Sequence, residues 1–194
     1  MTKIGAHSCI TYNGGGTNIP TYYNRNAAVQ YARTWWNGRN PQYPAFTDDC
    51  TNFISQCLRA GGAPMTGIPN RGKGWWITDG WQTGRPGQFA RETWSYSWSV
   101  SNAFKLYLDQ SKSGLSAKRV YSPSELTIGD VICYDFEGDG RINHTTIVTS
   151  MVNGVPYIHA HTVNSADRHY DYRNSLAYTP NTRYYYYHID DVFQ

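Results

Sequence analysis

The spacing of the apolar residues changes partway along the chain, and this change constrains the fold more than any other feature. Apolar residues recur at intervals of three and four over residues 27–35, about 50–60 and 100–108, as on the buried face of an amphipathic helix. Beyond residue 120 the interval becomes two, which is typical of half-buried strands. The sequence therefore predicts an α+β fold with N-terminal helices packed on a C-terminal antiparallel sheet.

Turn signals divide the strand-forming half of the chain. Strands are expected at about 130–135, 144–152, 155–161 and 183–189, and Asn153-Gly154 separates the second from the third as a two-residue hairpin turn. The segment DFEGDG at 135–140 is predicted to be a tight turn and not a calcium loop, because its twelfth position is Thr146 where a glutamate would be needed. Residues 61–98 show no sustained period and predict a long structured loop region.

The chain length suits one domain. Residues 1–21, with three consecutive glycines and Pro20, predict an irregular lead-in, and residues 22–194 predict a single domain. No apolar run reaches the length of a membrane span, and no hydrophobic signal core is visible at the N-terminus. The 17 Lys and Arg residues form no block and the net charge is only +3, so nucleic-acid binding has little support.

Aromatic residues are unusually common. The chain has 17 Tyr and 7 Trp, whereas charged residues make up 16%, against about a quarter in typical domains. Such a composition suits an aromatic-lined surface that grips sugars or extended peptides. Trp75, Trp76, Asp49 and His159 are predicted to contact the substrate.

Cys50 is the first candidate catalytic residue. It follows Asp48-Asp49, and because either aspartate could cap the second helix, the thiol is expected in the first helical turn. The helix dipole and the unpaired backbone N–H groups there favour a thiolate, the nucleophilic form. Cys57 lies mid-helix and is predicted to be core. From local sequence alone, Cys50 could also be a buried small residue.

His144 is the candidate base, since a neutral imidazole at a strand start can accept a thiol proton. If Asn153 and Gly154 are the turn residues, Thr146 faces His161, which places His161 diagonally beside His144 on one face of the sheet. His161 is therefore the preferred residue to fix the tautomer of His144.

Two other residues remain open for this third position. His159 would lie on the same face, one step farther from the base, and is the second choice. Asn164 would point to the opposite face. A register slip of one residue would reverse the preference, because each side chain would then change face.

No metal site is predicted. The chain has no HExxH motif, and the pair His159 and His161 has no obvious third and fourth ligand. Thiol chemistry needs no metal, so neither a metal nor another cofactor is expected.

The segment YYNRNAAVQYARTWWNGRNPQYPAFTDDCTNFISQCLRAGG, together with LTIGDVICYDFEGDGRINHTTIVTS and PYIHAHT, resembles the putative amidase domain family, a papain-like group related to CHAP domains. The resemblance covers about residues 22–165. It implies a papain-like cysteine peptidase or amidase fold, with Cys50 as nucleophile and His144 as base, and His161 matches the His-Thr position of the family. It further implies hydrolysis of amide C–N bonds through a thioester acyl-enzyme.

The resemblance also implies a bacterial, secreted or cell-wall-associated hydrolase, expected to be a monomer, whose substrate is a peptide or peptidoglycan. Two other functions stay open at this point. One is a toxin-like cysteine protease that acts on proteins with the same catalytic residues. The other is a non-catalytic, aromatic-rich module that binds carbohydrate or peptide.

Overall fold

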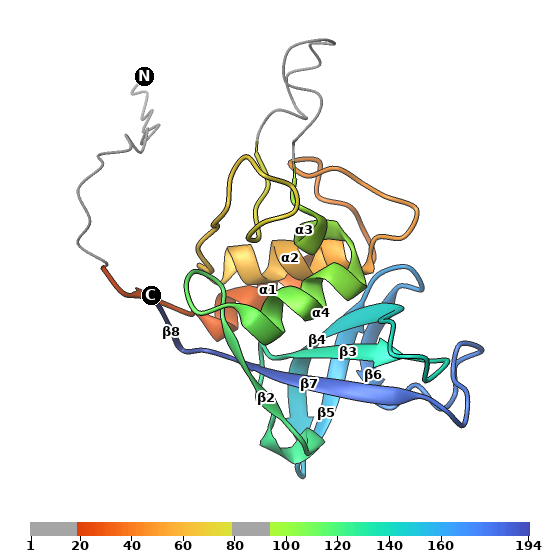
Figure 1. Ribbon diagram of the computed structural model, residues 1–194. Helices are drawn as coiled ribbons and strands as arrows, with labels where there is room; N and C mark the ends of the chain where they lie inside the picture. The colour runs from red at the N-terminus through yellow and green to blue at the C-terminus, as the bar shows by residue number, and fades with distance from the viewer. Residues whose placement is uncertain (1–18, 79–93) are drawn as a thin grey trace, which may run out of the picture.

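The computed structural model describes residues 19–78 and 94–194 (Figure 1). Cys9, most of the predicted lead-in and part of the aromatic middle segment lie outside these residues. The three predicted helices are confirmed as α1 (Arg25–Trp35), α2 (Cys50–Ala60) and α4 (Ser101–Gln110). A short helix that the sequence analysis missed, α3 (Tyr96–Ser99), precedes α4. None of the described helices is long and apolar enough to cross a membrane.

Local signals explain where the first two helices begin and end. The Asn24 side chain accepts a hydrogen bond from the backbone N–H of Ala27 and so caps α1. Helix α2 ends at Ala60, and Gly61 is its C-cap. A side chain at Gly61 would collide with the Tyr23 ring, because a Cβ there would lie 2.4 Å from a ring carbon. The glycine therefore lets the end of α2 approach the segment that leads into α1.

The main sheet has six strands in the order β2-β7-β3-β4-β5-β6, with every neighbouring pair antiparallel. Its strands are β2 (Ala117–Val120), β3 (Val131–Asp135), β4 (His144–Val152), β5 (Val155–Ala160), β6 (Ser165–His169) and β7 (Arg183–Ile189). The four predicted strands are confirmed. Strands β2 and β6 were not predicted, nor was the two-stranded sheet of β1 (Thr21–Tyr22) and β8 (Val192–Phe193).

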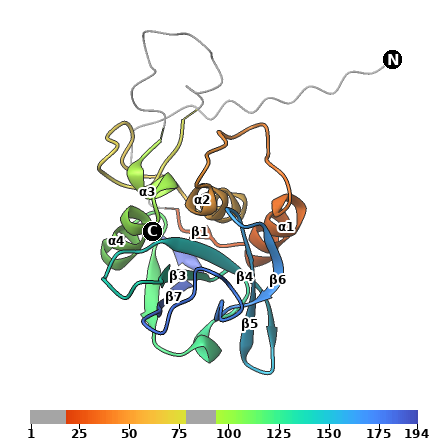
Figure 2. The same cartoon turned by 90° about the vertical axis from the view of Figure 1, so that its right-hand side faces the viewer.

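The helices cover one face of the main sheet (Figures 1 and 2). On this face Phe53 and Leu58 of α2 belong to one buried cluster with Cys133 and Ile147 of the sheet. The opposite face carries a second, more aromatic cluster, which includes Tyr134, Phe136, Val148, Ile158 and Tyr172. Side chains along each strand alternate between these clusters, so strand register decides which residues can meet.

The predicted register of the β4–β5 hairpin is correct only near its turn. Val152 pairs with Val155 as expected, and Asn153 and Gly154 both have positive φ, as this turn requires. Farther along, the pairing shifts by one residue, so that Ile147 faces His159. The extra residue is Thr149, which forms a β-bulge. The bulge reverses the facing of the distant residues and overturns the prediction that His161 lies beside His144.

Candidate active site

Cys50 begins α2, as predicted, and its side chain is buried among hydroxyl groups. Its Sγ lies 3.3 Å from the Ser101 Oγ at the start of α4, and the Ser101 Oγ lies 2.8 Å from the Thr51 Oγ1. The other two described cysteines, Cys57 and Cys133, are free and fully buried. Burial raises the pKa of Cys57 well above its usual range and that of Cys133 to about 12. Their environment therefore disfavours the thiolate.

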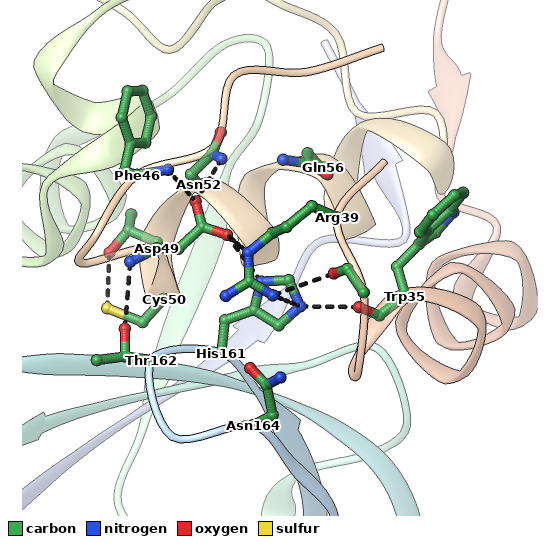
Figure 3. Close-up of polar contacts among 12 residues, drawn as sticks. Trp35, Arg39, Phe46, Asp49, Cys50, Asn52, Gln56, His161, Thr162 and Asn164 are labelled. Carbon is green, nitrogen blue, oxygen red and sulfur yellow. Dashed lines mark hydrogen bonds and ion pairs between the residues drawn. The ribbon is translucent and has the colours of Figure 1, made fainter. Parts of the chain in front are cut away.

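Asp49 does not use its side chain to cap α2, contrary to one of the two predicted caps. Its carboxylate points instead to four donors (Figure 3). Oδ1 accepts from the Phe46 backbone N–H at 3.2 Å and from the Asn52 Nδ2 at 2.7 Å; Oδ2 lies 2.8 Å from the Arg39 Nε and 2.9 Å from the His161 Nδ1. Asp49 is completely buried. The prediction that it contacts substrate is therefore wrong, because no surface of the carboxylate remains accessible.

Arg39 reduces the effect that the negative charge of Asp49 has on the neighbouring Cys50. A bare carboxylate beside Cys50 would oppose formation of a thiolate, since like charges repel at short range. The Arg39 guanidinium offsets that charge at hydrogen-bond distance. The backbone N–H of Asp49 donates to the Thr162 Oγ1 at 3.2 Å, which ties the start of α2 to the end of β5.

His161 lies on the helix side of the sheet, where its ring stacks on Phe53 with 3.8 Å between ring centroids. Its Nδ1 lies 2.9 Å from Asp49, and its Nε2 lies 2.8 Å from the Trp35 carbonyl oxygen. Both ring nitrogens are therefore occupied by partners other than His144. The expectation that His161 orients His144 fails because the Thr149 bulge places the two histidines on opposite faces.

His144 begins β4, as predicted, and lies on the aromatic side of the sheet against Tyr134 and Phe136. Its Nε2 lies 2.8 Å from the Tyr172 hydroxyl oxygen. Burial, and to a smaller extent the positive charge of Arg168, together lower the pKa of His144 to about 4. The imidazole is therefore neutral at neutral pH.

Tyr172 links the histidine to the cysteine. The Arg168 Cζ lies 4.0 Å from the centroid of its ring. Its pKa is raised to about 12, chiefly by burial, and a negative charge on Cys50 contributes to that increase. A second link joins the residues that follow the two candidates, since the Thr51 Oγ1 lies 3.4 Å from the Thr145 Oγ1. The start of α2 and the start of β4 are thus neighbours.

The other predicted substrate contacts are not accessible. Trp75 and Trp76 have no exposed surface, and their indole N–H groups donate to the Ser55 Oγ and to the Asn70 and Lys73 carbonyl oxygens. His159 is also buried, with its Nδ1 2.7 Å from the Thr149 Oγ1. These residues stabilise the fold, and their predicted role in substrate binding is wrong.

Asn164 does not take the third position either. Its Nδ2 lies 3.4 Å from the Asn37 Oδ1, on the loop that follows α1. Sequence reasoning therefore missed the residue that contacts His144, namely Tyr172. Only its position in a tyrosine-rich segment after β6 distinguishes it, and that signal is shared with many other tyrosines. Within residues 19–78 and 94–194, no three His, Cys, Asp or Glu residues are grouped so that they could hold a metal ion.

An α+β domain that brings a thiol, several hydroxyls and a neutral imidazole to neighbouring element starts has the layout of a candidate hydrolase. The chain belongs to the Putative amidase domain family, whose model matches residues 22–187. This confirms the family indicated by the sequence motifs, and the family description indicates hydrolase activity on amides.

Two curated relatives come from Bacillus subtilis (strain 168). Uncharacterized protein YhbB is 55% identical over 170 residues, which cover 87% of this chain and 51% of that protein. Uncharacterized protein YjcM is 31% identical over 151 residues, which cover 73% of this chain and 31% of that protein. The chain thus spans about half or less of the length of these relatives. No solved structure matches it.

Proposed function

We propose that this chain is a cysteine-dependent amidase or peptidase in which Cys50 is the nucleophile, His144 the base and Tyr172 the residue that orients the base. The observation that carries this proposal is the 2.8 Å contact between the His144 Nε2 and the Tyr172 hydroxyl. If Nε2 carries the proton and donates to the tyrosine oxygen, Nδ1 is left as the acceptor. Tyr172 would then fill the position predicted for His161.

The chemistry follows from these positions. The His144 Nδ1 takes the thiol proton of Cys50, and the thiolate attacks the amide carbonyl carbon. The C–N bond breaks as His144 returns the proton to the leaving amine, which leaves a thioester on Cys50. Water, deprotonated by His144, then attacks the thioester, releases the carboxylic acid and restores the thiol.

The start of α2 supplies the means to stabilise the oxyanion that forms in both steps. Backbone N–H groups in a first helical turn have no acceptor within the helix. The N–H of Cys50 is such a group, and it lies next to the attacking sulfur. Donors fixed in this way need no rearrangement as charge develops on the carbonyl oxygen.

The protonation state of His144 supports its role as base. Because the pKa of His144 is about 4, the imidazole is neutral at pH 7 and has a nitrogen free of a proton, while the same lowered pKa makes it a weaker base than an ordinary histidine. Its burial among aromatic rings also disfavours a permanent imidazolium. The imidazole of His144 therefore becomes charged only as the reaction proceeds.

We propose that the substrate is a peptide amide of the bacterial cell wall. We further propose that the fold is papain-like and related to CHAP domains, and that the protein is secreted or attached to the cell wall. The order of elements, with a cysteine at a helix start and a histidine on a following antiparallel strand, agrees with this fold. The family membership supports amide hydrolysis. The burial of Trp75 and Trp76 weighs against the binding-module alternative, because two of the expected platform residues cannot reach a ligand.

The test is mass spectrometry of peptidoglycan fragments after incubation with the protein. Wild-type protein should produce new amine and carboxylate ends, and Cys50→Ala should produce none. Cys133→Ala is the matched control, because it removes a thiol that lies in the same sheet-helix core but has no exposed surface. Activity should survive EDTA. Full activity in Cys50→Ala, or loss with EDTA that zinc restores, would overturn the mechanism.

A further inference from the structure

A cavity of about 570 Å³ lies on the outer side of α3 and α4, away from Cys50. One wall is the segment 66–74, and the other is the exposed face of α4, which presents Ala103, Leu106, Tyr107 and Gln110. These α4 residues follow the three- and four-residue spacing of one helix face. The cavity is large enough for part of an extended ligand.

The segment 66–74 is built as a rigid wall. Thr66 and Trp75 exchange backbone hydrogen bonds of 3.1 and 3.0 Å, which close the segment into a loop. Gly74 has a φ of +66°, and a Cβ there would lie 1.9 Å from the Thr66 carbonyl oxygen. Only glycine permits this close approach, so the loop shape is fixed by its sequence.

The lining of the cavity is positively charged. Arg71, Lys73 and Lys112 line it, and no aspartate or glutamate among residues 19–78 and 94–194 does. Among the described residues, none of these three cations forms an ion pair. By contrast, Lys105 on the same helix is paired with Asp109 at 2.7 Å. Within the part of the chain that the structure describes, the charge in the cavity is therefore not neutralised by an ion pair.

Arg71 is held in place before any ligand arrives. Its Nε donates to the Trp94 carbonyl oxygen at 3.1 Å, and its Cζ lies 4.8 Å from the centroid of the Tyr96 ring. These contacts fix the plane of the guanidinium and, as far as the described residues are concerned, leave its two terminal nitrogens for other acceptors. A planar, fixed fork matches the two oxygens of a carboxylate or phosphate.

Helices α3 and α4 contribute residues both to the cavity and to the surroundings of Cys50. Ser101 starts α4 and touches the Cys50 Sγ, and Ala103, two residues later, lines the cavity. The Trp98 indole, at the end of α3, donates to the Asn52 Oδ1 of α2 at 2.8 Å. A ligand in the cavity would thus lie beside the unit that also supports Cys50.

We propose that this cavity binds an oxyanion, a carboxylate or a phosphate, carried by a part of the substrate remote from the scissile amide. The inference rests on the proposed amide hydrolysis for its link to substrate, although the binding of the oxyanion itself does not. Arg71 supplies the bidentate contact, and Lys73 and Lys112 add positive charge at the rim. Tyr96 and Tyr107 offer ring faces to the group that carries the oxyanion.

The experiment measures ligand binding by isothermal titration calorimetry with the full chain. The probes are N-acetylalanine, its neutral amide and methyl phosphate. We expect wild-type protein to prefer the anionic probes to the neutral amide by about tenfold, and Arg71→Gln to lose that preference. Arg71→Lys keeps the positive charge but not the planar, bidentate guanidinium, and should lose most of the preference for the anionic probes. Lys118→Gln is the control, because Lys118 is an exposed cation outside this cavity.

The outcomes separate this inference from the proposed hydrolysis. Preference for N-acetylalanine would assign a peptide carboxylate, and preference for methyl phosphate a phosphodiester polymer. Equal binding of all three probes, or equal binding by wild type and both Arg71 variants, overturns the inference even if Cys50 is catalytic. If Arg71→Gln fails to fold, the exposed pair Lys73→Gln and Lys112→Gln must weaken anion binding for the inference to stand. Conversely, an inactive protein that still binds the anion overturns only the hydrolysis.

Discussion

Two histidines lie near the same end of the main sheet but on opposite faces, and their surroundings differ in almost every respect. His144 is enclosed by aromatic rings, and among the described residues its imidazole has one polar side-chain partner, the Tyr172 hydroxyl. His161 lies between a carboxylate and a carbonyl oxygen, with Arg39 3.3 Å from its Nε2. A base must have a nitrogen available to take a proton. The comparison favours His144 as the base and assigns His161 to the support of Asp49.

The same comparison explains why Arg39 and His161 surround Asp49 at the start of α2. Asp49 needs its partners because an unpaired buried carboxylate is very costly. His161 and Arg39 hold that carboxylate and, through it, the loop from Trp35 to Asp49 that precedes Cys50. The face with His144 needs no such network, because a neutral imidazole is tolerated among apolar rings.

The largest expected effect is on turnover, where the two histidines should differ most. His144→Ala should lower kcat/KM for an amide substrate by about 10³-fold, because the thiol would lose its proton acceptor. His161→Ala should leave activity per folded molecule close to that of the wild type. Both are measured on one substrate, at a temperature where circular dichroism shows both variants folded. A loss in folded His161→Ala as large as that in His144→Ala would restore His161 to the catalytic group.

The next effect is on stability and should run in the opposite order. His161→Ala removes one of the two side chains that face Asp49 Oδ2, so the free energy of unfolding should fall by about 3 kcal/mol. Urea denaturation at pH 7 measures it. His159→Ala is the matched control, because His159 is buried nearby, but its Nδ1 contacts the Thr149 hydroxyl and the Asp167 backbone N–H, and it forms no ion pair with a carboxylate among the described residues. If His159→Ala costs as much as His161→Ala, loss of packing and not the pairing with Asp49 is the cause.

The sequence predicts the three longer helices, four of the main strands and the hairpin turn. Of the two histidines, it places His144 correctly at the start of a strand but places His161 on the wrong face of the sheet. Periodicity and Asn153-Gly154 are local signals, and the structure follows them. The bulge at Thr149 leaves no mark in the run HTTIVTSMV, because threonine suits a regular strand as well as a bulged one. One undetected residue therefore moved His161 to the other face.

The predicted substrate contacts are wrong for a second reason, namely that polar and aromatic side chains can be buried as well as exposed. Trp75, Trp76 and Asp49 can each either face a ligand or find a partner inside the protein, and residue type does not distinguish these cases. Trp75 finds its partner Ser55 20 residues away in the chain, and Asp49 finds His161 112 residues away. Only the tertiary structure shows that these polar groups are already satisfied.

A smaller effect sharpens the role of Tyr172. Tyr172→Phe removes the hydroxyl that contacts the His144 Nε2, so His144 loses what fixes its tautomer, and kcat should fall by about tenfold with little change in KM. Tyr184→Phe is the control, since that hydroxyl donates to the Asp171 carbonyl oxygen in the same aromatic region without touching His144. Equal kcat values for the two variants would remove Tyr172 from the mechanism and leave Cys50 and His144 as a dyad.

The smallest effect concerns the acid limit of activity. The pKa of His144 is about 4 in the folded protein, below its usual value, so the neutral base persists as the pH falls from 7 and is lost only near pH 4. Because Arg168 contributes to this lowering, Arg168→Gln should raise the pKa of His144 and move the acid limb of kcat/KM upward by roughly half a pH unit. Arg168→Lys keeps the positive charge and should leave the limb in place, which separates charge from the packing of Arg168 over the Tyr172 ring. Arg173→Gln removes a nearby, well-exposed cation that has no part in lowering the pKa of His144, and it should also leave the limb unchanged. An acid limb near pH 6.5 in the wild type would show that the group titrating in kcat/KM is not His144 in its buried, aromatic surroundings, and would place the base elsewhere.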